Sequence, residues 1–281
     1  MKLKLLLPMV ALFGQILGCS YDAAPQAFEG NLDDANHVIY GDYSMEELPK
    51  EQPYRGALVS LFERKTLQSL KTGQIYRVDE KFGGQELPWA EQSSASYCSG
   101  ILVAPDMVLT AGHCLSSPYS CENLQLVFNY NIMNDSQEFE VRDCKAVVKT
   151  VVDVAGKGLD YALLQISEPV QVDMPEVIER PLSVGEKVYA LGDPLGSYKK
   201  KSSGEVRSLL RTNGIYETTL DVFEGNSGSP VFSSKGDRLV GILSSGERDF
   251  SEDGGVKICG VRDCSGELVI PWTKILEDSK K

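Results

Sequence analysis

The chain has 281 residues, of which 42% are hydrophobic and 24% are charged, and its formal net charge at pH 7 is -12. This composition is typical of a globular protein with a sizeable core, arranged as one large domain or as two small β domains. Apart from the triplet Lys199–Lys201, the basic residues are scattered along the chain. A nucleic-acid-binding protein concentrates such residues on one face, so we expect no nucleic-acid partner. We interpret the lysine triplet as the solvated tip of a loop.

The first residues have the pattern of an export signal. Lys2 and Lys4 precede the apolar run Leu5–Leu17, which is shorter than the roughly 20 residues of a transmembrane helix. The sequence Ile-Leu-Gly-Cys that ends at Cys19 resembles a bacterial lipobox. We therefore predict a lipoprotein-type signal peptide at residues 1–18 and a lipid on Cys19, which would be the chain's one contact with a membrane, periplasmic or surface-facing. The alternative is a plain secretory signal and a secreted protein.

Residues 19–37 are polar and acidic without periodicity, which predicts a tether. From Val38 onward, short apolar or alternating runs are separated by turn-forming residues, and no long helical pattern lies between them. This texture favours an all-β fold of antiparallel barrels or a sandwich. The segment Pro271–Glu277 is the exception, because Trp272, Ile275 and Leu276 share one helical face and predict a short terminal helix. The expected strands are Ala57–Phe62, Tyr97–Val103, Val108–Thr110, Leu124–Phe128, Phe139–Val148, Ala162–Ile166, Lys187–Leu191, Gly204–Leu210, Ile215–Leu220, Pro230–Phe232, Leu239–Ser244 and Leu268–Pro271.

The cysteines support an exported protein. There are seven, and setting Cys19 aside for the lipid leaves an even number, which predicts three disulfides. Their order along the chain suggests the pairs Cys98–Cys114, Cys121–Cys144 and Cys259–Cys264. A zinc site is the rival use of cysteines, but the chain has no C-x-x-C pair and only two histidines, His37 and His113. We expect no metal and no cofactor.

A glycine-rich turn around Ser227, within Phe223–Phe232, predicts nucleophilic chemistry. A serine hydroxyl needs a base within hydrogen-bond reach and donors for the oxyanion that it creates, and glycines let bare N–H groups approach a bound carbonyl. His113 supplies a candidate base, and Asp160 stands at the head of an apolar strand. An ordinary Ser/Gly hairpin turn is the alternative for this stretch taken alone.

Three segments containing these residues resemble the signature blocks of the chymotrypsin-like serine peptidases, in that family's order of His, Asp and Ser. They are Thr110–Cys114, Asp160–Leu164 and Gly225–Pro230. Within the family, Val38–Asp42 and Tyr189–Pro194 are similar to segments of the bacterial glutamyl-endopeptidase-like branch. An α/β-hydrolase is disfavoured, because its triad order is Ser, Asp, His and its elbow needs a glycine where this chain has Ser229.

The resemblance implies an all-β, chymotrypsin-like fold of two six-stranded antiparallel β-barrels with a short C-terminal helix. Residues 38–175 would form the barrel that carries the histidine and the aspartate, and residues 176–281 the barrel that carries the serine. The implied activity is that of a monomeric serine endopeptidase acting on a polypeptide. A peptidase-shaped binding or adhesion lipoprotein without turnover is the alternative. We expect no chaperone-protease with a peptide-binding C-terminal domain, because only ten residues follow Pro271.

The family's roles carry over to matching positions. Ser227 would attack the scissile carbonyl, His113 would act as general base and then general acid, and Asp160 would orient the imidazole. The backbone N–H groups of Gly225 and Ser227 would form the oxyanion hole.

Leu243–Gly246 resembles the family's substrate-binding strand. Ser244, Ser245 and Gly246 would contact an extended peptide, and Ser244 would touch Asp160. Asp221, six residues before Ser227, is open to two interpretations. It is either the base of a pocket for Lys or Arg, or a structural acceptor. A glutamate preference is disfavoured, because the strand with Ile242–Ser244 has no histidine.

Two residues depart from the digestive members of the family. Asn226 stands where zymogen-activated members have an aspartate that pairs with a freed N-terminus, so this switch is not expected, and cleavage before Val38 is left open. Phe223 replaces a cysteine, so the pocket-closing disulfide is absent.

Overall fold

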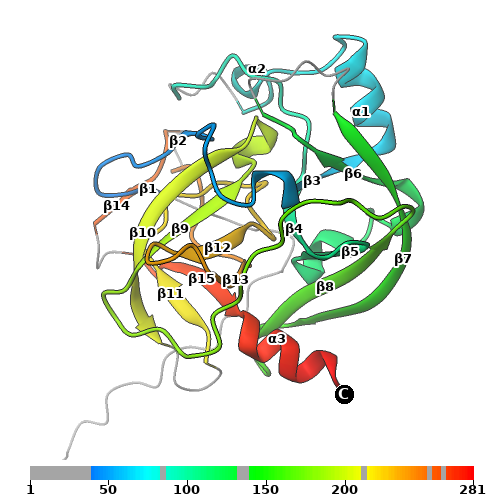
Figure 1. Cartoon of the computed structure of the whole chain (residues 1–281). Coiled ribbons are helices and arrows are strands. Elements are labelled where there is room, and N and C mark those ends of the chain that lie inside the picture. Colours follow the sequence, from blue (N-terminus) through cyan, green and yellow to red (C-terminus); the bar gives the residue numbers. More distant parts are fainter. Residues whose placement is uncertain (1–38, 83–86, 132–138, 210–213, 252–254, 261–263) are drawn as a thin grey trace, which may run out of the picture.

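The computed structural model describes residues 39–82, 87–131, 139–209, 214–251, 255–260 and 264–281. Two closed six-stranded antiparallel β-barrels lie side by side, and the C-terminal helix packs below the line along which they meet (Figure 1). The fold class expected from the sequence is therefore confirmed. The expected signal peptide, the tether with Cys19, and Val38 lie outside the described residues.

The first barrel closes in the order β3-β4-β5-β8-β7-β6. Every neighbouring pair is antiparallel, with Leu58 opposite Ile101 where β3 meets β4 and Thr110 opposite Ala162 where β5 meets β8. Closure leaves no unpaired sheet edge, so backbone groups are satisfied around the whole ring. The strands are β3 (Leu58–Glu63), β4 (Cys98–Ala104), β5 (Met107–Thr110), β6 (Leu124–Phe128), β7 (Glu140–Asp153) and β8 (Leu159–Ile166).

The second barrel follows the order β11-β15-β13-β12-β9-β10 and closes through the pairing of β10 with β11. Its strands are β9 (Lys187–Gly192), β10 (Lys200–Leu209), β11 (Tyr216–Thr218), β12 (Pro230–Ser233), β13 (Leu239–Leu243) and β15 (Glu267–Pro271). Two short pieces from the start of the described chain pack on this barrel. β2 (Glu46–Glu47) extends β10, and β1 (Ile39–Tyr40) pairs in parallel with β14 (Ile258–Cys259).

Two helices that the sequence patterns did not indicate, α1 (Arg64–Lys71) and α2 (Val78–Phe82), follow β3 and precede β4 along the chain, and Figure 1 shows both at the top of the molecule. The expected terminal helix is present as α3 (Trp272–Ser279). Its Ile275 is 1% exposed, but Leu276 is 36% exposed and lies outside the buried face where we expected it. Of the helices that the structure describes, none is long and apolar enough to cross a membrane.

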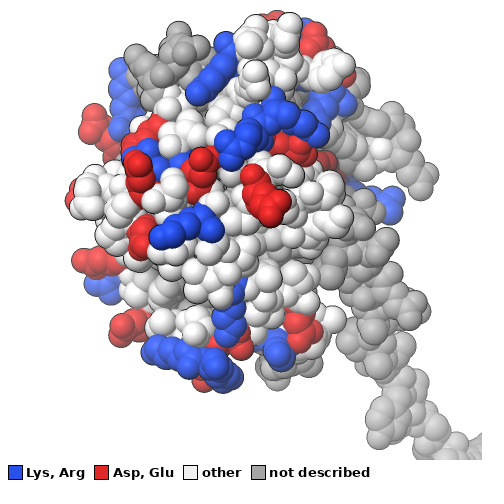
Figure 2. Space-filling view, turned by 90° about the vertical axis from the view of Figure 1, so that its right-hand side faces the viewer, with Lys and Arg blue, Asp and Glu red and all other residues white. Residues whose placement is uncertain are grey.

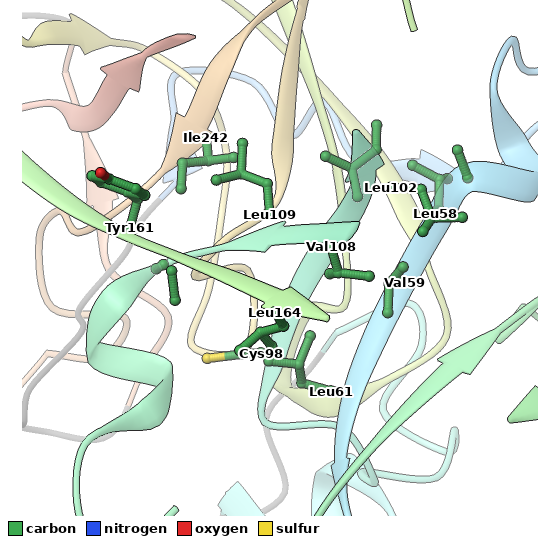
Figure 3. Packing of buried hydrophobic residues seen from close by; sticks show 14 of the residues in the cluster. Leu58, Val59, Leu61, Cys98, Leu102, Val108, Leu109, Tyr161, Leu164 and Ile242 are labelled. Carbon is green, nitrogen blue, oxygen red and sulfur yellow. The ribbon is translucent and has the colours of Figure 1, made fainter. Parts of the chain in front are cut away.

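The largest apolar cluster fills the first barrel and continues across the seam into the second. Ile242 of β13 and Ile270 of β15 belong to the same cluster as Leu109 and Tyr161 of the first barrel. Figure 3 shows Ile242 beside both of these side chains. Fully burying a side chain of this size stabilises the fold by about 1.5–3 kcal/mol, so the two barrels are joined by their shared core.

The three disulfides pair as their order suggested. Cys98–Cys114, Cys121–Cys144 and Cys259–Cys264 are formed, and the first two lie in the first barrel. Cys98 begins β4 and Cys114 lies in the 3₁₀ turn η2 (Gly112–Leu115) that follows β5. This bridge ties the turn to the barrel wall.

The lysine triplet is not the solvated loop tip that we expected. Lys199, directly before β10, is 2% exposed, and Lys200, the first residue of β10, is 3% exposed. Lys199 forms an ion pair with Asp193 at 2.9 Å, and Lys200 pairs with Glu47 at 2.9 Å. A buried lysine is stable only when paired, and these partners are distant in sequence or belong to an adjacent turn, so the local charge pattern did not indicate them. On the face shown in Figure 2, acidic and basic side chains are interspersed.

We predict that Leu109→Ala lowers the free energy of unfolding by about 2–5 kcal/mol, because it leaves a cavity where the barrels share their core. Leu209→Ala is the matched control, since Leu209 is 42% exposed, and we expect a change below about 0.5 kcal/mol. Denaturant unfolding measures both values. Equal effects at the two positions would contradict the shared core.

Candidate active site

The candidate base, His113, lies in η2, directly after β5. The disulfide to Cys98 holds the following residue, Cys114. Gly112 permits the turn, because a Cβ at this position would lie 2.3 Å from the carbonyl oxygen of Val151 and 3.0 Å from Oδ1 of Asp160. The backbone can therefore pass close to β7 and β8 only with glycine here.

Asp160 is the second residue of β8 and is fully buried. Its Oδ1 accepts from the backbone N–H of His113 at 2.9 Å, and its Oδ2 lies 2.7 Å from Nδ1 of the same residue. Burial alone would raise the pKa of the Asp160 carboxyl. The hydrogen bonds from His113 and Ser244 and the electrostatic attraction of the His113 ring outweigh burial and hold this pKa below its usual value. A carboxylate can only accept, so the Nδ1 atom carries the proton and Nε2 is left as the basic nitrogen.

Ser227 approaches from the second barrel, in the turn between residues 223 and 229 that precedes β12. Its carbonyl accepts from the N–H of Ser99 in β4 at 2.8 Å and lies 3.8 Å from Sγ of Cys114. The turn that carries the serine is thus bound to the wall and to the disulfide of the first barrel.

Ser244, directly after β13, contacts both sides of the site. Its hydroxyl donates to Oδ2 of Asp160 at 2.6 Å, and its carbonyl accepts from Oγ of Ser227 at 3.4 Å. Nε2 of His113 is buried and has no hydrogen-bond partner among the described residues. The structure therefore brings His113, Asp160, Ser227 and Ser244 together, with the serine hydroxyl turned to the Ser244 carbonyl. Hydrogen bonds of this kind are often long before a substrate binds.

The backbone at Gly225 has φ of 92°, a conformation that favours glycine. A Cβ here would lie 2.4 Å from the carbonyl oxygen of Asp193, so glycine is also needed for space. Within the described part of the chain, the N–H groups of Gly225 and Ser227 donate no hydrogen bond. Buried N–H groups are rarely left unpaired, and two in one turn offer an anion a place to bind.

Cys98, His113 and Cys114 place their ligand-type atoms within 4.8 Å of one another. Both sulfur atoms are joined in the disulfide, and Nδ1 of the histidine faces Asp160. Metal sites of this kind use thiolates, so this donor set does not fit a metal ion.

Asp221 is 1% exposed and faces the start of the described chain. Its two carboxylate oxygens accept from the N–H groups of Tyr40 and Ser44, each at 2.7 Å. Burial raises the pKa of Asp221 above its usual value, although these hydrogen bonds act in the opposite direction. This arrangement favours the structural acceptor over the base of a pocket for a cationic side chain.

The other expected substrate-binding residues lie in one segment. Ser244 and Ser245 are bonded to β15, through Ser244 N–H to the Leu268 carbonyl at 2.9 Å and Leu268 N–H to the Ser245 carbonyl at 2.7 Å. Gly246 follows, and the fully buried carboxyl group of Glu267 lies directly against it. The sequence patterns did not indicate Glu267, because its contact with Gly246 depends on the pairing of β13 with β15.

The two departures from the digestive pattern have visible structural consequences. Phe223 packs against Phe250, with ring centroids 6.4 Å apart, and this tilted ring contact connects the segment before Ser227 to the segment after Gly246. Glu224 N–H also donates to Oδ2 of Asp249 at 2.9 Å. Asn226 is buried, and its Nδ2 has no hydrogen-bond partner within the described ranges.

Three buried residues near the serine turn were not identified as site residues. Ser99 donates its hydroxyl to the Gly225 carbonyl at 2.9 Å and accepts from the N–H of Asp193 at 3.0 Å. Asp193 pairs with Lys199. Of these three residues, only Lys199 stood out in the sequence, as part of the lysine triplet. Charge patterning alone predicts a solvated position for such a triplet, so it did not indicate a buried ion pair.

We predict that Asp221→Ala destabilises the fold by about 1–3 kcal/mol, because two buried N–H groups lose their acceptor. Asp42→Ala, at an exposed position, is the control and is expected to change stability by less than about 0.5 kcal/mol. Thermal or denaturant unfolding measures the difference. A stable Asp221→Ala variant that loses only its preference for Lys or Arg in peptides would restore the pocket interpretation.

Glu247 predicts a pH dependence of stability. Burial alone would raise its pKa, but hydrogen bonds from Lys257 and Ser265 outweigh burial and lower it from 4.5 to about 2. Between these values the unfolded chain binds the proton more tightly, so stability from this group is present above pH 4.5 and is lost as the pH falls toward 2. Glu247→Gln should flatten the fall in stability between pH 5 and pH 2, measured by unfolding at each pH. Parallel curves for the two proteins would contradict this role.

Residues 98–242, slightly more than half of the chain, match the family model described as a trypsin-like peptidase domain. A probable periplasmic serine endoprotease DegP-like of Pseudomonas putida (strain GB-1) is 25% identical over 274 residues, covering 90% of this chain and 50% of the relative. Protease Do-like 1, chloroplastic, of Arabidopsis thaliana is 27% identical over 133 residues, covering 42% of this chain and 29% of the relative. The chain thus spans half or less of the length of these two relatives.

Solved structures show the same fold. A Glu endopeptidase in complex with MPD superposes with a TM-score of 0.54 at 19% identity, covering 87% of this chain and 100% of that one. The VesB protease of Vibrio cholerae gives a TM-score of 0.56 at 13% identity, covering 85% of this chain and 66% of that one. The residues that match the family model include His113, Asp160 and Ser227. The chain belongs to the trypsin-like serine peptidase family.

Proposed function

We propose that this protein is a serine endopeptidase that hydrolyses peptide bonds through an acyl-enzyme on Ser227. The observation that carries the proposal is the double contact of Ser244, which donates to Asp160 and accepts from Ser227. A single residue thereby joins the carboxylate that holds His113 to the candidate nucleophile. A protein that only binds peptides has no need of this arrangement.

In the proposed reaction, Ser227 Oγ leaves the Ser244 carbonyl and donates its proton to Nε2 of His113 as it attacks the scissile carbonyl. His113 then gives the proton to the leaving amine, and water repeats the sequence to release the acyl group. Asp160 keeps the proton on Nδ1, so that Nε2 is basic, and it stabilises the imidazolium that forms. The low pKa of its carboxyl favours this role, because the group stays ionised.

The unpaired N–H groups of Gly225 and Ser227 are the proposed donors to the oxyanion. A donor that is already fixed in a water-poor site costs no reorganisation when charge develops on the substrate oxygen, and one such donor is worth about 10²–10³-fold in kcat. Both groups lie in the buried turn that carries the nucleophile.

An extended polypeptide is the proposed substrate, added beside Ser244, Ser245 and Gly246 by main-chain hydrogen bonds. We propose a structural role for Asp221, since both of its oxygens hold the segment at Tyr40 and Ser44. A cleavage profile on a peptide library then defines the side-chain preference.

We propose that the protein is exported and acts as a monomer, with residues 38–175 and 176–281 as its two barrel domains. The three disulfides support an oxidising compartment, and the P. putida relative is named as periplasmic. The lipid on Cys19 and the signal peptide at residues 1–18 remain part of this proposal. Mass spectrometry of the mature N-terminus tests them, and an unmodified first residue other than Cys19 would refute the lipid.

Labelling with a fluorophosphonate probe tests the activity. We expect covalent modification of Ser227 in the oxidised wild type, no modification of Ser227→Ala, and a fall in kcat of about 10⁴-fold or more for Asp160→Asn, because the wrong tautomer of His113 is favoured. Ser208→Ala is the matched control, a serine in β10 outside the site. A correctly oxidised wild type that neither labels nor cleaves peptides would favour the alternative, a binding or adhesion lipoprotein.

A further inference from the structure

The direction of the Gly225 N–H is fixed by the carbonyl on the other side of the same peptide bond. The Glu224 carbonyl accepts from the N–H of Leu195 at 2.5 Å. A trans peptide is planar, with its C=O and N–H pointing in opposite directions. Holding the Glu224 carbonyl therefore aims the Gly225 N–H the opposite way, away from the turn Asp193–Gly196.

This turn is itself closely bound to the serine turn. The Ser99 hydroxyl links the two, since it donates to the Gly225 carbonyl at 2.9 Å and accepts from the Asp193 N–H at 3.0 Å. The Asp193 carbonyl accepts from Gly196 N–H at 3.0 Å and leaves room only for glycine at position 225. A shift of the Asp193 turn must therefore move the peptide that carries the Gly225 N–H.

The turn does not hold its shape by local preference. Leu195, whose N–H makes the decisive contact, has φ of 52° and ψ of 27°, a left-handed conformation that is unfavourable for leucine. Its side chain is 1% exposed and packs in a cluster with Phe223 and Trp89. Strain of this kind persists only where the surroundings over-determine it.

A buried ion pair supplies part of that constraint. Oδ1 of Asp193 accepts from Nζ of Lys199 at 2.9 Å, and the same ammonium donates to the Val59 carbonyl of β3 at 3.0 Å. The two side chains are 0% and 2% exposed. Burial acts against both charges, raising the pKa of Asp193 and lowering that of Lys199. Buried ion pairs add little net stability compared with apolar residues of similar size. The role of the Asp193–Lys199 pair is therefore better explained by the geometry that it imposes on the turn than by the stability that it adds.

We propose that Lys199 and Asp193 are positioning residues, whose buried ion pair anchors the turn at Leu195 to the first barrel and so aims the Gly225 N–H at the substrate oxyanion. This inference rests on the proposed function. It also explains how the turn is held although Asn226 offers no carboxylate to a freed N-terminus: the constraint comes from within the folded chain.

The double variant Asp193→Asn/Lys199→Met tests the proposal, because it removes both charges and leaves neither one buried alone. We expect it to fold, with kcat reduced about 10–100-fold and KM within about threefold of the wild type, because the oxyanion donor acts on the transition state. In a second variant, Lys199→Met alone, we expect an equal or larger loss of kcat. Lys200→Met is the matched control, since Lys200 is equally buried but is directed to Glu47 and Gln92.

Two further measurements separate positioning from general destabilisation. The affinity for a peptidyl boronic acid should fall in parallel with kcat/KM in the double variant, whereas the affinity for a product peptide should not. Amide hydrogen exchange at Leu195 should become faster in the double variant and stay unchanged in Lys200→Met. This exchange does not require turnover, so it tests the anchor even if the proposed function is wrong.

The outcomes are distinct. A wild type that fails to label at Ser227 contradicts the proposed function, and faster exchange at Leu195 would then still support the anchor. A labelled wild type whose folded double variant keeps kcat within twofold, with unchanged exchange at Leu195, overturns the positioning role alone. A loss of activity in Lys200→Met as large as in the double variant would also overturn it, because the effect would then belong to any buried lysine near the start of β10.

Discussion

The buried carboxylate of Asp160 is the constraint on which the rest of the structure depends. An isolated charge at this depth would be strongly destabilising, and it is tolerated only because donors surround it. His113 provides two of them from the first barrel, and Ser244 provides another from the second. The carboxylate is therefore satisfied only when the two barrels are docked. Assembly of the site and docking of the barrels are, in this respect, one event.

A second set of polar contacts across the seam also joins the two barrels. Ser99 in the first barrel binds the Gly225 carbonyl and the Asp193 N–H of the second, while Lys199 reaches back to β3. The apolar core between the barrels supplies the bulk of the stability, and these polar contacts set the register in which the barrels meet. The turn that carries Ser227 is bonded to Ser99 through the Gly225 carbonyl and to Ser244 through the Ser227 hydroxyl. Its geometry is consequently defined from both sides, which suits the proposed reaction, because nucleophilic attack tolerates little displacement.

The sequence predicted the features that depend mainly on residues close to one another along the chain. Runs of alternating or apolar residues located the barrel strands, and the pairs of cysteines followed chain order. The blocks around His113, Asp160 and Ser227 indicated which distant residues meet, through a family resemblance, and Ser244 contacts Asp160 as that resemblance implied. The boundaries differed by a few residues, because strand ends depend on neighbours that a single sequence does not show.

What the sequence did not reveal depends on tertiary partners. Lys199 and Lys200 are polar residues at the start of a strand, and only the fold supplies the carboxylates that allow their burial. Helix α1 buries Leu67 and Leu70, but its eight residues give too short a pattern to stand out. For Asp221, both interpretations fitted the spacing, and the choice between them depends on the course of the backbone at Tyr40 and Ser44.

A crystal structure of the protein with a peptidyl boronic acid would show directly whether His113, Asp160 and Ser227 act together on a substrate carbonyl. We predict a covalent bond from Ser227 Oγ to boron, one boronate oxygen accepting from the N–H groups of Gly225 and Ser227, and His113 Nε2 within hydrogen-bond distance of the adduct. His113 Nδ1 should remain on Asp160, and Ser244 should keep its contact with that carboxylate. A boronate bonded to another side chain, or one whose oxygen points away from the Gly225 N–H while Nε2 stays without a partner, would contradict this prediction.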